Sequence, residues 1–183
     1  MNPREKEYLI VEAHLSKEPE IGRWLWALQD TRQRTLRELG QLNPAIIDWR
    51  PSGNESSIGT VLYHLAGIEA DWLYVEVLEQ PFPPEVDALL SYPIRDEQGR
   101  LTQVEGFSLE QHLSRLETVR GLLLDVFQQM DLPEFRRARS LANYEVTPEW
   151  VLHHLMQHEA EHRGQIGTLR AGAERHLAAG TDQ

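Results

Sequence analysis

The sequence of 183 residues contains no cysteine. This absence excludes disulfides, thiolate metal ligands and a cysteine nucleophile. Any transition-metal site must therefore use nitrogen and oxygen ligands. The sequence also lacks an apolar run long enough to cross a membrane, and its N-terminus does not fit a secretory signal. We therefore expect a cytoplasmic protein without a membrane partner.

Basic residues are in the minority. Lys and Arg number 18 against 29 Asp and Glu, which gives a net charge of −11 and a pI near 5.2. An acidic chain repels phosphate backbones, and no basic stripe alternates with aromatic residues, so we do not expect a nucleic-acid partner. The densest basic cluster, residues 136–139, lies in a predicted loop and is interpreted as a solvated turn.

The pattern of apolar residues predicts an all-α protein with a single domain over residues 1–183. No alternation of strands and helices, internal repeat or linker is visible, and 40% hydrophobic content is typical of one globular domain. Helical spacing predicts four long helices and, over residues 4–16, a short leading helix. The long helices are expected over about 19–39, from Ser56 or Ser57 to before Pro81, from Ser108 to about Met130, and from Thr147 to about residue 177.

Local signals support these helix starts. Ser108 opens a capping box, and Thr147 followed by proline and glutamate combines an N-cap with a favourable first turn. The second helix is expected to bury a stripe made of Val61, Leu65, Ile68, Trp72 and Val75.

Nearly thirty residues, rich in proline and turn formers, connect the second and third predicted helices. This connection is longer than two antiparallel neighbours need, and it can carry the chain from one end of a bundle to the other. The predicted architecture is therefore a four-helix bundle with one long crossover.

The segment His158-Glu159-Ala160-Glu161-His162 carries the clearest chemical signal. Two histidines four residues apart lie one turn apart on the same helix face, so both rings can reach one ion. His154 lies one turn earlier, but about 12 Å separates it from His162 along the helix axis, too far to share that ion. The segment also fits H-E-x-x-H, in which the glutamate acts as a general base.

A third ligand should come from another helix. His64 is the best candidate because it borders the apolar stripe of the second helix, and His112 on the third helix is a weaker alternative. His14 and His176 lie in less certain segments, and His153 should be exposed. Each histidine also has a simpler interpretation as a hydrogen-bonded core or surface residue. Three neutral imidazoles would leave coordination positions open, which is the catalytic pattern.

A zincin-type protease is a poor interpretation of this segment. The extended protease motif would need glycine and histidine where the chain has Gln165 and Thr168, and Glu174 is too close on the same helix to be a distant acidic ligand. Glu159 stays a candidate catalytic base. Alternatively, Glu159 and Glu161 could hydrogen-bond to the metal ligands, or they could be acids exposed to solvent.

Arg120 lies on the inward stripe of the third predicted helix. We expect its long side chain to reach solvent at the end of the bundle. Pairing with a buried acid such as Asp71, or binding a substrate carboxylate, are the alternatives.

Three stretches, residues 48–51, 57–65 and 154–166, resemble the DinB/YfiT-like family of metal-binding four-helix bundles. The resemblance implies a site for zinc, nickel or a similar divalent ion made of His64, His158 and His162. It further implies an up-down-down-up bundle and frequent homodimers. Relatives include S-transferases and isomerases that use low-molecular-weight thiols.

The leading functional hypothesis is a metal-dependent enzyme that transfers a small thiol to a small electrophilic substrate. Hydrolysis by water activated at the metal, with Glu159 or a loop acid as base, is the first alternative. A non-catalytic metal-binding stress-response protein and a bundle without a metal are the others.

Overall fold

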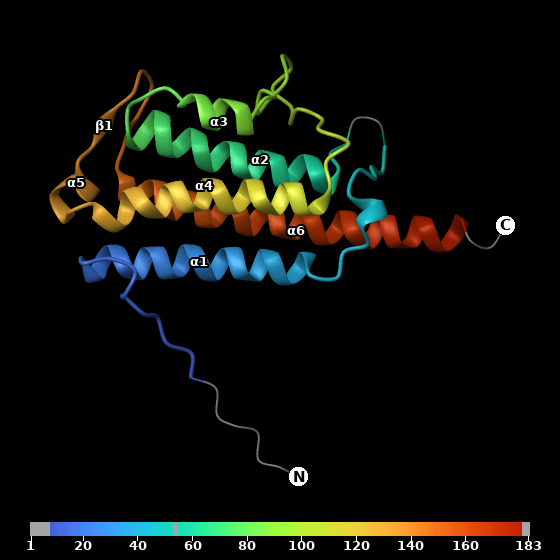
Figure 1. The fold of residues 1–183 in the computed structure, drawn as a ribbon, viewed down its shortest axis with the longest axis horizontal. Helices are drawn as coiled ribbons and strands as arrows, with labels where there is room; N and C mark the ends of the chain where they lie inside the picture. The colour runs from blue at the N-terminus through green and yellow to red at the C-terminus, as the bar shows by residue number, and fades with distance from the viewer. Residues whose placement is uncertain (1–7, 53–54, 181–183) are drawn as a thin grey trace, which may run out of the picture.

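The computed structural model describes residues 8–52 and 55–180, and its main elements are four long helices that lie side by side (Figure 1). The all-α class is confirmed, since the two strands found in the described residues form only a small hairpin. The long helices are α1 (Pro19–Leu39), α2 (Ile58–Asp71), α4 (Leu109–Gln129) and α6 (Pro148–Gly180). The short elements are η1 (Pro44–Ile46), η2 (Trp72–Val77), α3 (Pro84–Leu89), α5 (Leu132–Arg136), β1 (Arg139–Ser140) and β2 (Glu145–Val146).

Helices α1 and α6 run in one direction and α2 and α4 in the other, as the colour gradient in Figure 1 shows. Helix α6 packs against α1 and α2, and α2 also packs against α4. Apolar side chains from these helices form two buried clusters, one around Leu62, Leu116 and Ile166 and the other around Leu25 and Leu123. The long helices therefore share a core along their length.

The predicted helix starts are confirmed. Ser57 and Thr147 each accept an N–H from the first turn of their helix, at 3.0 and 3.2 Å. Ser108 and Gln111 form the expected capping box at the start of α4. Helix α6 continues to Gly180, beyond the predicted end.

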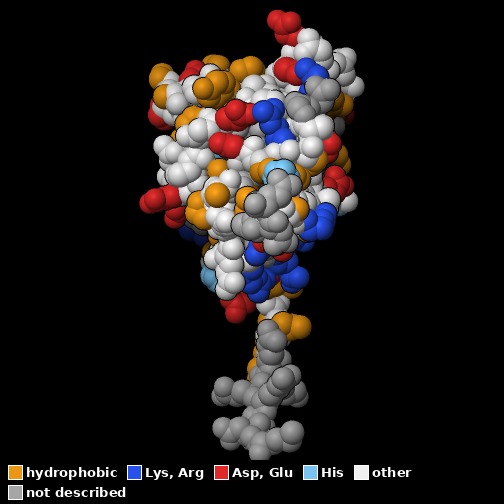
Figure 2. All heavy atoms as spheres, turned by 90° about the vertical axis from the view of Figure 1, so that its right-hand side faces the viewer, with side chains coloured by type: hydrophobic (Ala, Val, Ile, Leu, Met, Phe, Trp, Pro, Cys, Tyr) orange, Lys and Arg blue, Asp and Glu red, His pale blue; other side chains and the backbone are white. Residues whose placement is uncertain are grey.

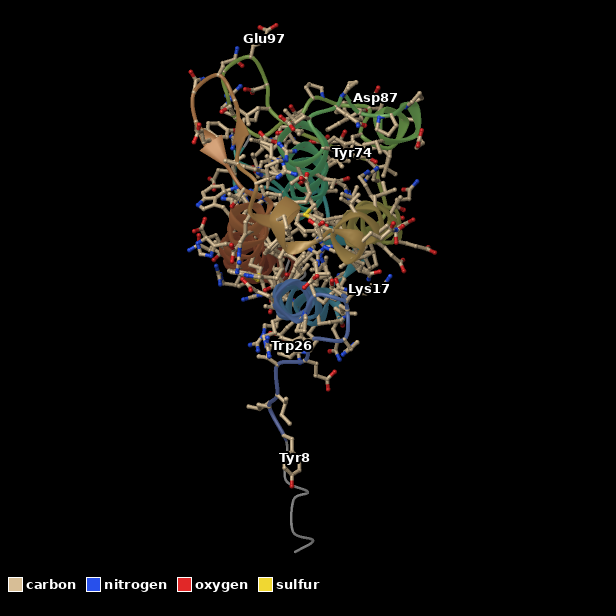
Figure 3. All side chains as sticks on the ribbon, turned by 90° about the vertical axis from the view of Figure 1, so that its left-hand side faces the viewer. Tyr8, Lys17, Trp26, Tyr74, Asp87 and Glu97 are labelled. Carbon is tan, nitrogen blue, oxygen red and sulfur yellow. The ribbon has the colours of Figure 1, made fainter. Side chains whose placement is uncertain are left out.

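The leading helix is wrong over the residues that can be judged. Residues 8–13 have no regular structure, and residues 14–18 form turns and bends that lead into α1 at Pro19. Residues 4–7 lie outside the described residues. Figure 3 shows Tyr8 well away from the helical body, and Leu9 is 87% exposed. A short helix without a packing partner lacks the tertiary contacts that stabilise most protein helices.

The apolar stripe of the second helix is correct at its start and wrong at its end. Val61 and Leu65 are buried, but Val75 is 39% exposed, and Leu73 and Val77 are buried instead. The chain changes from α- to π-helical geometry at η2. The wider π turn rotates the following side chains, so regular α-helical spacing no longer predicts the inward face.

The basic segment 136–139 is a solvated turn only in part. Arg136 and Arg137 are exposed, but Arg139 is fully buried, and the prediction is wrong for this residue. Its guanidinium donates to the carbonyl oxygens of Val77 and Glu134 at 3.2 and 2.9 Å. These carbonyls and the carboxylate of Glu134, which forms an ion pair with Arg139, replace water around the charge and tie the chain after α5 to the end of η2.

Surface charges are mixed on the end of the molecule that carries the end of α6. Figure 2 shows acidic and basic side chains interspersed there with apolar ones, without a continuous basic stripe on the visible face. None of the helices in the described residues is long and apolar enough to span a membrane.

Candidate metal centre

Three histidines from two helices converge in the interior. His64 comes from α2, and His158 and His162 lie one turn apart on α6. Each offers a ring nitrogen, and these nitrogens lie within 4.8 Å of one another. The ring centroids are 4.5 to 5.0 Å apart. The structure thus brings together the three residues that the sequence analysis selected, here called the histidine cluster.

The spacing of two of these nitrogens suits a divalent ion. The Nε2 atoms of His64 and His158 are 3.1 Å apart. Two nitrogens bound to one zinc ion at about 2.0–2.1 Å, at a near-tetrahedral angle, would lie about 3.3 Å apart. The two rings can therefore share an ion with little movement.

Burial keeps His64 and His158 neutral. Desolvation, together with the neighbouring rings of His158 and His162, lowers the pKa of His64 to about 3. Desolvation likewise lowers the pKa of His158 to about 3, helped by His162 and His154. Neutral imidazole is the form that binds a metal, so these rings are ready to act as ligands at neutral pH.

Gln165 orients the ring of His162, a contact that the sequence analysis missed. Its Oε1 atom lies 2.8 Å from Nδ1 of His162. When Nδ1 carries the hydrogen and donates it to Gln165, Nε2 keeps its lone pair for a metal. The signal in the sequence is the spacing of three residues on a helix, which places the two side chains on one face.

The crossover segment adds positive charge near the histidine cluster. Ile94 packs against α2 at Gly67, where an added Cβ would lie 2.8 Å from the isoleucine side chain. The glycine thus allows the segment to approach α2 closely, one turn beyond His64. The charge of Arg95, the next residue, contributes to the lowered pKa values of both His64 and His158.

The remaining histidines do not belong to the histidine cluster. His112, the weaker alternative ligand, is buried on α4 with Nδ1 3.1 Å from Arg115, and it does not join the group. His153 is exposed, as predicted. His154 stacks on Trp150 with ring centroids 5.1 Å apart. His14 pairs with Glu12, and His176 packs against Trp49.

A second buried polar group lies beside the histidine cluster and takes one charged residue from each long helix. We call Arg32, Glu69, Arg120 and Glu159 the charge cluster. Arg32 donates to Glu69 at 2.7 Å and to Glu159 at 2.8 Å. Arg120 donates to both oxygens of Glu69, at 2.6 and 3.0 Å, and to Glu159 at 3.0 Å. All four side chains are at least 94% buried.

The charge cluster corrects two expectations. Arg120 does not reach solvent or pair with Asp71, because the carboxylates of Glu69 and Glu159 meet its guanidinium inside the core. Glu159 is only 2% exposed, so it is not a solvated acid, whereas Glu161 is exposed. Burial alone would raise the pKa of Glu159, but Arg32 and Arg120 hold it below its ordinary value. Charged residues on inward helix positions are the sequence signal for this group.

Comparison with known proteins gives one clear result. A search of curated proteins finds no match to this chain. The family model of the DinB superfamily matches residues 27–166, a span that contains both the histidine cluster and the charge cluster. The match covers well over half of the sequence, and the chain therefore belongs to the DinB superfamily.

Proposed function

We propose that the chain is a metal-dependent enzyme in which His64, His158 and His162 hold a divalent ion, zinc or nickel. The observation that carries the proposal is the convergence of three ring nitrogens within 4.8 Å of one another, with His64 buried and His158 and His162 half-buried. Imidazole nitrogen suits both ions, and three protein ligands leave coordination positions open for a substrate.

When bound, the ion would supply a Lewis acid that lowers the pKa of a small thiol or a water molecule and orients it. The chain's own residues prepare this site. Burial holds His64 and His158 neutral, and Gln165 sets the ring of His162. The positive charge of Arg95 favours an anionic group next to the histidines.

The proposed reaction is transfer of a small thiol to a small electrophilic substrate. Because the chain has no cysteine, the thiol must come from a cosubstrate. Membership of the DinB superfamily supports this chemistry, since thiol-dependent transferases are among the relatives that the sequence resembles. Hydrolysis stays the alternative outcome of the test below.

The role of Glu159 as a catalytic base stays a prediction, and its contacts support a different role. Both of its carboxylate oxygens accept hydrogen bonds from buried guanidinium groups. We propose that Glu159 is a positioning residue, which fixes the rotation of α6 and so aims His158 at His64.

Two further expectations belong to the same proposal. We propose that the four long helices form an up-down-down-up bundle, which the helix directions in Figure 1 support. We also propose that the chain forms a homodimer, because the family that it resembles frequently does.

The test begins with metal content. Elemental analysis of purified wild-type protein should find one divalent ion per chain, and the double variant His64→Ala/His158→Ala should lose it. His153→Ala, which removes an exposed histidine of α6, is the matched control and should keep the ion. Wild-type protein without stoichiometric metal, or an equal content in the double variant, would refute the site.

Activity is then measured on a panel of electrophiles, with and without a small thiol. Turnover should require both the metal and the thiol. Metal-dependent turnover without thiol would exclude the transferase and favour hydrolysis. Absence of turnover under both conditions would favour a protein that only binds metal.

A further inference from the structure

A cavity of about 680 Å³ opens beside the start of α6, away from the charge cluster. Its lining comes from the start of η2, the β1–β2 hairpin with the residue before it, and the start of α6, three segments that meet at the left-hand end of Figure 1. The residues that line it are Trp72, Ala138, Tyr144, Glu145, Val146, Thr147 and Trp150. A cavity of this volume is large enough for a small organic molecule.

Aromatic rings form much of this cavity. The ring of Trp72 lies 5.3 Å from that of Trp150 and 6.3 Å from that of Tyr144, measured between centroids. Trp150 and Tyr144 are 47% and 45% exposed. Aromatic surface left open in a concave site is typical of a ligand pocket.

Two acidic side chains lie next to these rings. Glu145 lines the cavity, and the Tyr144 hydroxyl donates to Oε1 of Glu76 at 2.8 Å. Glu76 is 94% buried, and its Oε2 atom has no hydrogen-bond partner in the described part of the chain. Burial, Glu76 and Asp71 together raise the pKa of Tyr144 to about 12. The cavity lining contains no Lys or Arg to balance these carboxylates.

The start of α6 does not reverse this charge. A helix N-terminus carries about half a positive charge, which favours anions. However, Thr147 already accepts the N–H of Trp150, and Glu149 lies in the same first turn. With Glu145 in the lining, the formal negative charges exceed the partial positive charge, so the cavity favours a cation.

Stacked rings connect the cavity to the histidine cluster. His154 stacks on Trp150, with centroids 5.1 Å apart and planes 6° from parallel. Its centroid lies 4.6 Å from that of Trp72 and 5.8 Å from that of His158. Trp150 and His158 are separated by about 12 Å along the helix. The cavity thus lies on the same helix as the histidine cluster, with the His154 ring between them.

We propose that this aromatic cavity binds an organic cation, such as a quaternary ammonium or a protonated aryl- or alkylamine, and that it holds the cationic part of the enzyme's substrate. The negative faces of the aromatic rings and the nearby carboxylates attract the same kind of group. The assignment to the substrate rests on the proposed function, whereas binding of the cation does not.

The test is isothermal titration of the whole chain with benzyltrimethylammonium, in metal-free and metal-loaded protein. Benzyl alcohol is the neutral comparison and benzoate the anionic one. The cation should bind more tightly than either. Trp150→Leu should weaken its binding by about 2- to 30-fold, the range for loss of a cation–aromatic contact. Glu145→Gln, a change of nearly equal size at an exposed position, should also weaken it.

Trp26→Leu is the matched control, since Trp26 lies on α1 (Figure 3) and does not line the cavity. It should bind the cation as wild type does, and circular dichroism should show all three variants folded. Equal or tighter binding of benzoate or benzyl alcohol would overturn the proposal. Unchanged binding of the cation in both Trp150→Leu and Glu145→Gln would also overturn it.

The two proposals fail separately. If the chain holds no metal but binds the cation with these effects, the cavity assignment stands and the proposed function falls. If the chain turns over electrophiles with metal and thiol but does not bind the cation, only the cavity assignment is refuted.

Discussion

The histidine cluster and the charge cluster are neighbouring buried polar groups built on the same helices. Helix α2 contributes His64 to one and Glu69 to the other, and α6 contributes His158 and Glu159. In the charge cluster two guanidinium groups and two carboxylates pair in full. In the histidine cluster three rings face one another without an opposite charge among them, and the buried Nδ1 atom of His64 lacks a partner in the described residues.

This difference separates a group whose charges are fully paired from one whose ring nitrogens could hold a metal ion. Buried polar atoms in folded proteins are normally paired, and a fully paired network makes the packing unique. Converging histidine nitrogens are instead an arrangement that could hold a metal ion. The same helices thus carry both the fully paired charge cluster and the candidate metal centre.

The largest expected effect is on the charge cluster. Arg120→Ala leaves Glu69 and Glu159 without one of their two buried partners, so we expect the free energy of unfolding to fall by about 3–5 kcal/mol. Urea denaturation measures this loss. Arg34→Ala is the control, because its exposed pair with Asp30 should contribute only about 0–1 kcal/mol. A loss below 1 kcal/mol for Arg120→Ala would mean that the charge cluster does not hold the fold.

Added metal should stabilise the folded protein only when the histidine cluster is intact. Zinc at about one hundred times its dissociation constant should raise the free energy of unfolding by about 2.7 kcal/mol. His64→Ala/His158→Ala should show no such gain, and His153→Ala should show the full one. Thermal denaturation with and without metal gives the comparison. An equal gain in the double variant would place the metal elsewhere.

Acid should weaken the metal-free protein through the same histidines. The pKa values of His64 and His158 are lowered to about 3 in the folded state, whereas unfolded histidine has a pKa near 6.5. The unfolded chain therefore binds more protons between these values, and stability present above pH 6.5 is lost as the pH falls towards 3.

When the pH is lowered from 7 to 5, each of these two histidines should reduce the free energy of unfolding by up to about 2 kcal/mol. Urea denaturation at both pH values should show a loss in wild type that is larger by about this amount than in His64→Gln. His112, with a pKa lowered to about 4, contributes equally to both proteins and cancels. The same pH dependence in wild type and His64→Gln would contradict the assignment.

The smallest effect expected is at the start of α2. Ser57→Ala removes the N-cap and should cost about 1 kcal/mol. Metal content by elemental analysis should stay at the wild-type level, because His64 lies two turns further along the helix. A loss of metal together with the cap would show that the histidine cluster depends on the helix end as much as on the charge cluster.

Much of the helical framework could be predicted from the sequence. Capping residues and apolar spacing are local signals, and they located the starts of α2, α4 and α6. The convergence of His64 with His158 and His162 was predicted from positions on helix faces together with the family resemblance. The π turn at η2 could not be predicted in this way, since apolar spacing assumes regular α-helical geometry throughout.

The sequence by itself determined the helix starts, the ligand types available and the pairing of two histidines on one face, because each depends on neighbours within a few residues. Only the tertiary structure decided which charges are buried together. Arg120 was expected at the surface and lies against Glu69 and Glu159, and Arg139 likewise is buried against backbone carbonyls. A long charged side chain can reach either solvent or a buried partner. The partners of Arg120 lie on other helices, 51 and 39 residues away along the chain, and a local pattern does not encode contacts over that distance.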